Sequence, residues 1–175
     1  MKRNLFFIKF GGYVFVSVLG TLFHFLYEWT NESVIFAPFT AVNESIFEHM
    51  KLLYFPYLFW SIIEYKILKN EYKNYWCAKA KSITLGLILI PTLYYTYTGA
   101  FGVYADWFNI LIFFISGAVT FIFDTKFLQK NNNCRFSKKV YLIYFLMLGA
   151  VLIVFTFLPF EIPLFLDKQS KNYGI

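Results

Sequence analysis

The sequence predicts an all-α, polytopic membrane helical bundle of about five transmembrane helices, with the N-terminus inside and the C-terminus outside. The 175-residue chain is 59% hydrophobic and 24% aromatic, and only 15% of its residues are charged. Its mean hydropathy is +0.55. A soluble domain is about 45–50% apolar and about 25% charged, and a globule of this length cannot bury so much apolar surface. This composition excludes a soluble enzyme and predicts a single membrane domain covering residues 1–175.

Five segments are apolar and long enough to cross a bilayer, which takes about 20 residues per helix. The second is the least apolar, because Glu64 and Lys66 lie near its end. The third is expected to end near Thr98, since two glycines follow. The predicted spans are residues 10–28, 50–68, 82–98, 107–123 and 140–160.

Residues 33–45, between the first two spans, are too short to cross the membrane and contain Pro38. Irregular backbone is tolerated at membrane depth only where protein or a water-filled cavity satisfies its polar groups. We therefore expect an outer re-entrant or interfacial segment next to a polar pocket.

The basic residues orient the bundle, because lysine and arginine are enriched in cytoplasmic loops. Thirteen of the 16 are predicted on one side: Lys2, Arg3, Lys9, Lys66, Lys69, Lys73, Lys79, Lys81, Lys126, Lys130, Arg135, Lys138 and Lys139. Since these residues lie in short stretches between apolar segments, no nucleic-acid partner is expected. We expect Glu64 to pair with Lys66 or Lys69, and Cys77 and Cys134 to be reduced thiols in cytoplasmic loops.

Both histidines and most carboxylates are predicted on the opposite, outer side. His24 and Glu28 are four residues apart and share one helix face. Ionisable groups in or near hydrocarbon are candidates for function. A structural His–Glu hydrogen bond at the interface is an equally good interpretation.

The stretch Asn43 to His49 opens the second predicted span. Ser45-x-x-Glu48 is typical of a capping box, which would give Glu48 a structural role. If the helix instead begins at or before Asn43, then Glu44 and Glu48 lie about 100° around the helix from His49. A metal site using all three of these residues is then awkward, and one or two of them joined by His24 or Glu28 is more plausible.

These residues predict an outward-opening polar pocket with acid–base or metal-assisted chemistry. Histidines with carboxylates suit zinc or a harder divalent ion, although no H-E-x-x-H spacing is present. The candidate catalytic residues are His24, Glu28, Glu44, Glu48 and His49. The candidate metal ligands are His24, Glu28, Glu48 and His49. Asn43, Lys51 and Asp106 are further candidates for the pocket, and Asp106 could instead cap its helix.

Four motifs resemble an uncharacterised family of small integral membrane proteins from low-GC Gram-positive bacteria. They read His24-x-x-x-Glu28-Trp29, Val42-Asn43-Glu44-Ser45-x-x-Glu48-His49-x-Lys51-Leu52, Tyr95-Thr96-Tyr97-Thr98-Gly99 and Ile162-Pro163-Leu164-Phe165-x-Asp167 with a final Tyr173-Gly174-Ile175. The resemblance implies a multi-pass protein of the bacterial cell (plasma) membrane and no particular reaction. His24-x-x-x-Glu28 is also similar, more loosely, to the pocket of sterol-isomerase-type membrane bundles.

Three functions remain open at this stage. The first is an enzyme that modifies or hydrolyses a lipid or lipid-linked substrate. The second is a small transporter or an ion- or proton-binding protein, for which few polar residues continue through the bilayer. The third is an accessory or scaffold subunit whose acidic rim is a docking surface. Apart from the lipid bilayer, the sequence identifies no partner and no oligomeric state.

Overall fold

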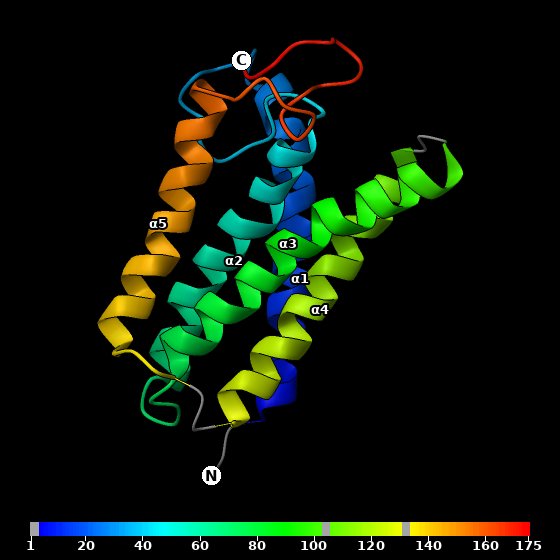
Figure 1. The fold of residues 1–175 in the computed structure, drawn as a ribbon. Coiled ribbons are helices and arrows are strands. Elements are labelled where there is room, and N and C mark those ends of the chain that lie inside the picture. Colours follow the sequence, from blue (N-terminus) through cyan, green and yellow to red (C-terminus); the bar gives the residue numbers. More distant parts are fainter. Residues whose placement is uncertain (1–3, 103–105, 131–133) are drawn as a thin grey trace.

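Five helices make up the computed structural model, which describes residues 4–102, 106–130 and 134–175. They are α1 (Leu5–Trp29), α2 (Ile46–Leu68), α3 (Tyr75–Phe101), α4 (Asp106–Gln129) and α5 (Lys138–Phe157) (Figure 1). No β-strand occurs in these described ranges. The predicted all-α helical membrane bundle is thus confirmed.

Four of these helices, α1, α3, α4 and α5, are long and apolar enough to cross a membrane. The fifth, α2, is as long but carries Glu48, Lys51, Glu64 and Lys66. It contacts all four other helices, and its residues Tyr54 and Tyr57 are completely buried. The charged helix is therefore the central one.

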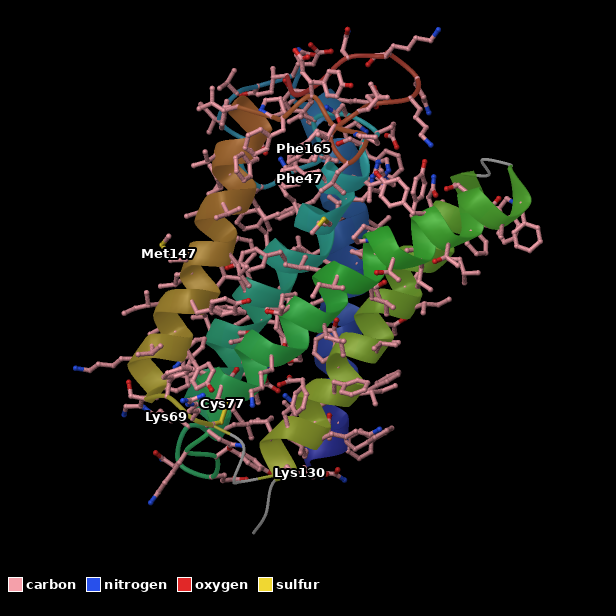
Figure 2. The ribbon with its side chains drawn as sticks, viewed as in Figure 1. Phe47, Lys69, Cys77, Lys130, Met147 and Phe165 are labelled. Carbon is pink, nitrogen blue, oxygen red and sulfur yellow. A yellow bond between two sulfur atoms is a disulfide. The ribbon has the colours of Figure 1, made fainter. Side chains whose placement is uncertain are left out.

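Large apolar side chains cover the outer faces of the other helices. Phe6 and Val18 of α1 and Ile143 and Met147 of α5 are exposed, and Met147 points away from the bundle in Figure 2. A soluble monomer rarely exposes apolar patches of this extent, whereas lipid accommodates them. We call the end of the bundle that carries the C-terminal tail the outer end, and the opposite end the inner end.

The observed helices differ from the predicted spans mainly at their ends. For example, α3 begins seven residues earlier than predicted and continues to Gly102, whose positive φ of 64° caps it. Such a left-handed cap favours glycine. The last helix ends at Phe157 rather than at residue 160, because the residue before Pro159 is disfavoured in the helical conformation.

A ring of four buried charges joins α1 to α4 near the inner end. Lys9 Nζ lies 2.6 Å from Glu64 Oε1 and 2.5 Å from Asp124 Oδ2. Lys79 contacts Glu64 and lies 2.6 Å from Asp124 Oδ2. The Tyr75 hydroxyl also donates to Glu64, at 3.0 Å. The expected pairing of Glu64 with Lys66 or Lys69 is therefore wrong, and Lys9 and Lys79 are buried residues of the bundle interior.

The ring is electrically neutral, with two ammonium groups and two carboxylates. All four side chains are at most 6% exposed. Taking a charge out of water costs several kcal/mol, which only close pairing offsets. Each helix from α1 to α4 contributes one member, so the ring is satisfied in a single register of these helices.

Cys77 and Cys134 form a disulfide, contrary to the expected reduced thiols. Cys77 lies in the first turn of α3 and Cys134 just before α5, with Cα atoms 6.0 Å apart. This separation is within the range that a disulfide bridges. The bond lies at the inner end of the bundle, as the position of Cys77 in Figure 2 shows. Two cysteines do not make a disulfide framework, but they suffice for one crosslink between distant segments.

Breaking the charge ring should destabilise the bundle. Asp124→Leu leaves two ammonium groups facing one carboxylate, and we expect it to lower the free energy of unfolding in detergent by about 3–5 kcal/mol. Lys9→Met combined with Asp124→Leu restores neutrality and should recover most of that loss. The control is Lys126→Met, an exposed residue two positions further along α4, which should stay within about 0.5 kcal/mol of wild type. Wild-type stability of Asp124→Leu would contradict the pairing role.

The disulfide predicts resistance to thiol reagents. Protein treated with a maleimide–polyethylene glycol in native membranes should show no gel shift before reduction and a double shift after it. Cys77→Ser should show a single shift without reduction, because it frees Cys134. Double labelling of unreduced wild type would instead support the reduced pair that a cytoplasmic location implies.

Candidate functional site

The outer end of the bundle is closed by two irregular segments, residues 30–45 and the C-terminal tail after α5. Within the first segment, Ala37, Thr40 and Ala41 are buried while Val34 and Ile35 are exposed. Such a segment keeps a fixed conformation only if its polar backbone is satisfied. Two sets of contacts do this.

The first set is a buried network around Glu48 and Lys51. Lys51 Nζ lies 2.6 Å from Glu48 Oε2 and donates to the Ala37 carbonyl at 2.8 Å and the Thr156 hydroxyl at 2.7 Å. Glu48 Oε2 also accepts the Val42 N–H at 3.0 Å. One ion pair thereby ties the irregular segment to α2 and α5.

The second set docks the tail. The Phe47 N–H donates to the Leu164 carbonyl at 3.1 Å, and the rings of Phe47 and Phe165 lie 4.4 Å apart (Figure 2). Asn43 Nδ2 donates to the Gly174 carbonyl at 2.8 Å. Gly174 has a positive φ of 68°, and a Cβ there would lie 2.9 Å from Pro159. Only glycine fits this position.

The start of α2 decides where Glu44 lies. Ser45 is the N-cap, and its hydroxyl oxygen accepts the Glu48 N–H at 3.3 Å. Glu44 therefore precedes the helix in irregular backbone and is not bound by the angular spacing of helical residues. Its carboxylate can approach His49, which a continuous helix from Asn43 would prevent.

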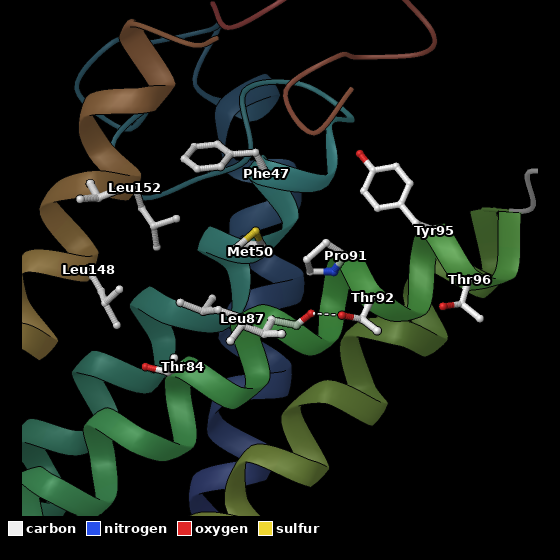
Figure 3. A pocket seen from close by; sticks show the side chains of 12 residues that line it. Phe47, Met50, Thr84, Leu87, Pro91, Thr92, Tyr95, Thr96, Leu148 and Leu152 are labelled. Atoms are coloured by element: carbon white, nitrogen blue, oxygen red, sulfur yellow. Dashed lines mark hydrogen bonds between the residues drawn. The ribbon is translucent and has the colours of Figure 1, made fainter. Parts of the chain in front are cut away.

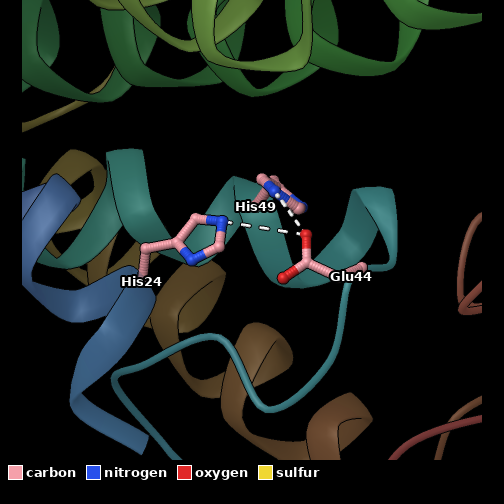
Figure 4. A group of neighbouring side chains, drawn as sticks. All are labelled: His24, Glu44 and His49. Carbon is pink, nitrogen blue, oxygen red and sulfur yellow. Dashed lines mark ion pairs between the residues drawn. The ribbon is translucent and has the colours of Figure 1, made fainter. Parts of the chain in front are cut away.

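His24, Glu44 and His49 converge at the outer end, from α1, the segment before α2, and α2 (Figure 4). Glu44 Oε2 lies 3.7 Å from His24 Nε2 and 3.5 Å from His49 Nε2. The three potential ligand atoms all lie within 4.8 Å of one another. We call these three residues the triad.

The tautomer of His49 follows from its second ring nitrogen. Nδ1 lies 2.8 Å from the Ser45 carbonyl oxygen, which only accepts hydrogen bonds. Nδ1 therefore carries the proton, and in the neutral imidazole Nε2 presents its lone pair. A lone pair on His49 Nε2 would repel the Glu44 carboxylate at 3.5 Å, so this contact is attractive only when a cation lies between the two groups or the imidazole carries a second proton. A backbone partner on the second nitrogen is also what orients metal-binding histidines.

The spacing of the triad suits a tetrahedral ion. Zinc binds histidine nitrogen and carboxylate oxygen at about 2.0–2.2 Å, which places tetrahedral ligands about 3.4 Å apart. The observed separations from Glu44 Oε2 are 3.5 and 3.7 Å. Two histidines and one carboxylate would leave a fourth position open.

The triad borders a cavity of about 370 Å³ between α1, α2 and α4. Its floor is the close approach of α1 to α4, where a Cβ on Gly20 would lie 2.6 Å from Phe113. Asn109 Oδ1 is buried there with no hydrogen-bond partner among the described residues. Gln169 reaches the cavity from the tail. The sequence analysis missed both amides, although Asn109 is a polar residue in an apolar stretch.

The other predicted site residues lie elsewhere. Glu48, Lys51 and Asn43 make the segment and tail contacts described above. Glu28 is exposed one turn beyond His24 and is not among the described residues that line the cavity. Asp106 is the first residue of α4, and its side chain lies outside the described part of the structure.

A second, larger cavity of about 570 Å³ opens between α2, α3 and α5 (Figure 3). Its lining is mostly aliphatic, with Met50, Leu87 and Leu148 among its residues. The Thr84 and Thr92 hydroxyls there donate to backbone carbonyls one turn earlier, at 2.8 and 2.7 Å. None of the described residues that line it carries a carboxylate, imidazole or amine.

The chain belongs to a family of unknown function, DUF6512, whose model matches residues 6–175. This agrees with the resemblance to an uncharacterised family. No curated protein and no solved structure matches the chain. The comparisons therefore establish the family and leave its chemistry to be inferred from the site.

The two neighbouring glutamates should respond differently to the same substitution. Glu48→Gln leaves Lys51 buried with its charge uncompensated, and we expect it to cost about 3–5 kcal/mol of stability. Glu44→Gln should unfold within about 0.5 kcal/mol of wild type, since Glu44 is 39% exposed. Thermal unfolding in detergent measures both. Equal stability of the two variants would remove the structural role of Glu48.

Proposed function

We propose that the protein is a membrane-embedded metal enzyme that binds a divalent ion, with zinc favoured, at His24, Glu44 and His49. One observation carries the proposal: the ligand atoms of His24, Glu44 and His49 all lie within 4.8 Å of one another, and the second ring nitrogen of His49 is held by the Ser45 carbonyl oxygen. An ion at the centre of these three atoms would be coordinated by all of them.

The ligand set supports hydrolytic chemistry. Zinc held by two histidines and one carboxylate keeps a position for water and lowers the pKa of that water to about 7. The resulting hydroxide would attack an electrophilic centre held in the cavity. The amides of Asn109 and Gln169, which line the cavity, would orient the substrate by hydrogen bonding.

The location proposed for the enzyme is a bacterial plasma membrane, with the triad on the outer side. The lysine distribution supports this orientation. The disulfide at the lysine-rich inner end weighs against this orientation, because the orientation places that end in the cytosol, where disulfides are rare.

A second candidate function is transport of the ion. The observation behind it is a second pair of carboxylates, Glu64 and Asp124, which lies below the triad, although Lys9 and Lys79 already pair with both of them. Buried Val16, Leu53 and Ile112 belong to the core that a pathway would have to cross. Ion flux into proteoliposomes would favour transport, and hydrolysis without flux would favour the enzyme.

Metal analysis tests the proposed site. Detergent-purified wild type should hold about one zinc per chain, which a chelator removes and added zinc restores. His24→Ala, His49→Ala and Glu44→Gln should each weaken zinc binding by more than about 100-fold, because even changes outside the ligand sphere cost about 10–100-fold.

Glu28→Gln is the matched control, since it removes an outer carboxylate of α1 that lies off the cavity, and its zinc affinity should equal that of wild type. Wild type without a divalent ion, or a folded His49→Ala variant with unchanged zinc affinity, would reject the metal site.

A further inference from the structure

The cavity beside the triad lies between α1, α2 and α4 and includes exposed apolar side chains in its lining. Among the described residues, its walls on α1 and α4 include Phe25 and Ile110, both of which expose much of their apolar surface. Figure 1 shows the outer ends of α3 and α4 leaning away from the outer end of α1. Below Gly20 the same helices are tightly joined, and the Tyr13 hydroxyl donates to the Phe114 carbonyl at 3.3 Å. The opening is thus a wedge between α1 and α4 that is closed at the level of Gly20.

The lining of the wedge is divided by chemistry. Most of its polar groups, the triad with Asn109 and Gln169, come from the outer turns, the segment before α2 and the tail, and the Thr21 hydroxyl near the floor donates to the Ser17 carbonyl. Its deeper apolar groups, including Leu52, Phe113 and Phe114, come from the interior of the helices. This gradient matches a molecule with a polar linkage at one end and a hydrocarbon chain at the other.

The volume limits how much of such a molecule is enclosed. About 370 Å³ accommodates on the order of a dozen water-sized groups, at about 30 Å³ each. That is room for a polar linkage and the first part of one chain, but not for a whole membrane lipid. The remainder would have to stay in the bilayer, which the gap between α1 and α4 permits.

We propose that the substrate of the metal site is a chain-bearing lipid of the outer-end leaflet, which enters sideways between α1 and α4 and places its polar linkage at the triad. This proposal rests on the proposed function for its chemistry, while the binding of the chain is tested separately. Hydrolysis would add water across the linkage: the bound hydroxide forms the new bond, the lipid bond breaks, and the departing oxygen takes a proton from solvent.

The probe is phosphatidylcholine with a diazirine on its acyl chain, added as a tracer to phosphatidylcholine vesicles that contain the zinc-loaded or zinc-free protein. After illumination, peptide mass spectrometry locates the crosslinks. We expect labelling of Phe25, Phe113 and Phe114 in both forms. Glycerophosphocholine, which has the same headgroup without chains, should not reduce it.

Two neighbouring substitutions on α4 form the matched pair. Ile110 lines the cavity and is 56% exposed, whereas Leu111 is 41% exposed and is not among the described lining residues. Ile110→Trp should lower the cavity labelling at least about tenfold, equivalent to about 1.4 kcal/mol of binding free energy. Leu111→Trp should leave the cavity labelling unchanged. Neither variant should change the labelling of Leu148 and Val151, which line the second cavity.

The outcomes separate the two proposals. Lateral entry is overturned, even if zinc is bound, by either of two results. The first is cavity labelling no stronger than the labelling of other exposed apolar residues, and the second is cavity labelling that Ile110→Trp does not reduce. Loss of labelling to glycerophosphocholine also overturns it, because a soluble headgroup compound would then be the ligand. If the metal analysis finds that the protein binds no zinc, labelling that is blocked by Ile110→Trp still supports the lipid site, and only the metal site is rejected.

Discussion

Neutralising charge away from water is the constraint on which this structure depends. The ring of Lys9, Glu64, Lys79 and Asp124 draws one member from each of the first four helices and exposes almost none of them. Two charges of each sign must meet within hydrogen-bonding distance, and any sliding or rotation of one helix would strand a charge in hydrocarbon. In lipid, apolar packing alone does little to fix how the helices align with one another, because the surrounding lipid tails are as apolar as the side chains. The ring supplies that register, and α2 can carry its charges because the other helices surround it.

A second buried pair solves a different problem at the outer end. Glu48 and Lys51 satisfy the Val42 N–H and the Ala37 carbonyl, so a stretch of irregular backbone is anchored by side chains instead of by a strand or helix. The tail adds the Phe47–Leu164 and Asn43–Gly174 hydrogen bonds. These contacts hold the residues just before the N-cap of α2, and Glu44 is one of them. The position of the exposed carboxylate in the triad therefore follows from buried contacts a few residues away.

The helical class and the five segments could be predicted from the sequence, because long apolar stretches have one stable solution in a bilayer. The helix ends were less predictable, since amphipathic extensions such as the first turns of α3 carry lysines that hydropathy assigns to loops. The ring was missed for the same reason: Lys9, Lys79 and Asp124 look like boundary charges until their partners on other helices are known. Glu64 was given sequence neighbours as partners, whereas its real partners lie 55 and 15 positions away in the chain. Pairing between helices is tertiary information that local spacing does not contain.

At the candidate site, too, the contacts between segments could not be predicted from the sequence, whereas the local capping motif could. His24 and His49 were predicted as site residues, and the choice between a capping box and an earlier helix start was left open at Asn43 to His49. The structure has Ser45 as the cap. That one choice frees Glu44 from the helix, directs Glu48 inward to Lys51, and lets the Ser45 carbonyl hold the His49 proton on Nδ1. The capping interaction thus assigns two carboxylates, four residues apart, to different tasks. Glu48 is buried and paired with Lys51, which stabilises the fold. Glu44 faces the imidazoles of His24 and His49 at distances that suit ligands of one metal ion.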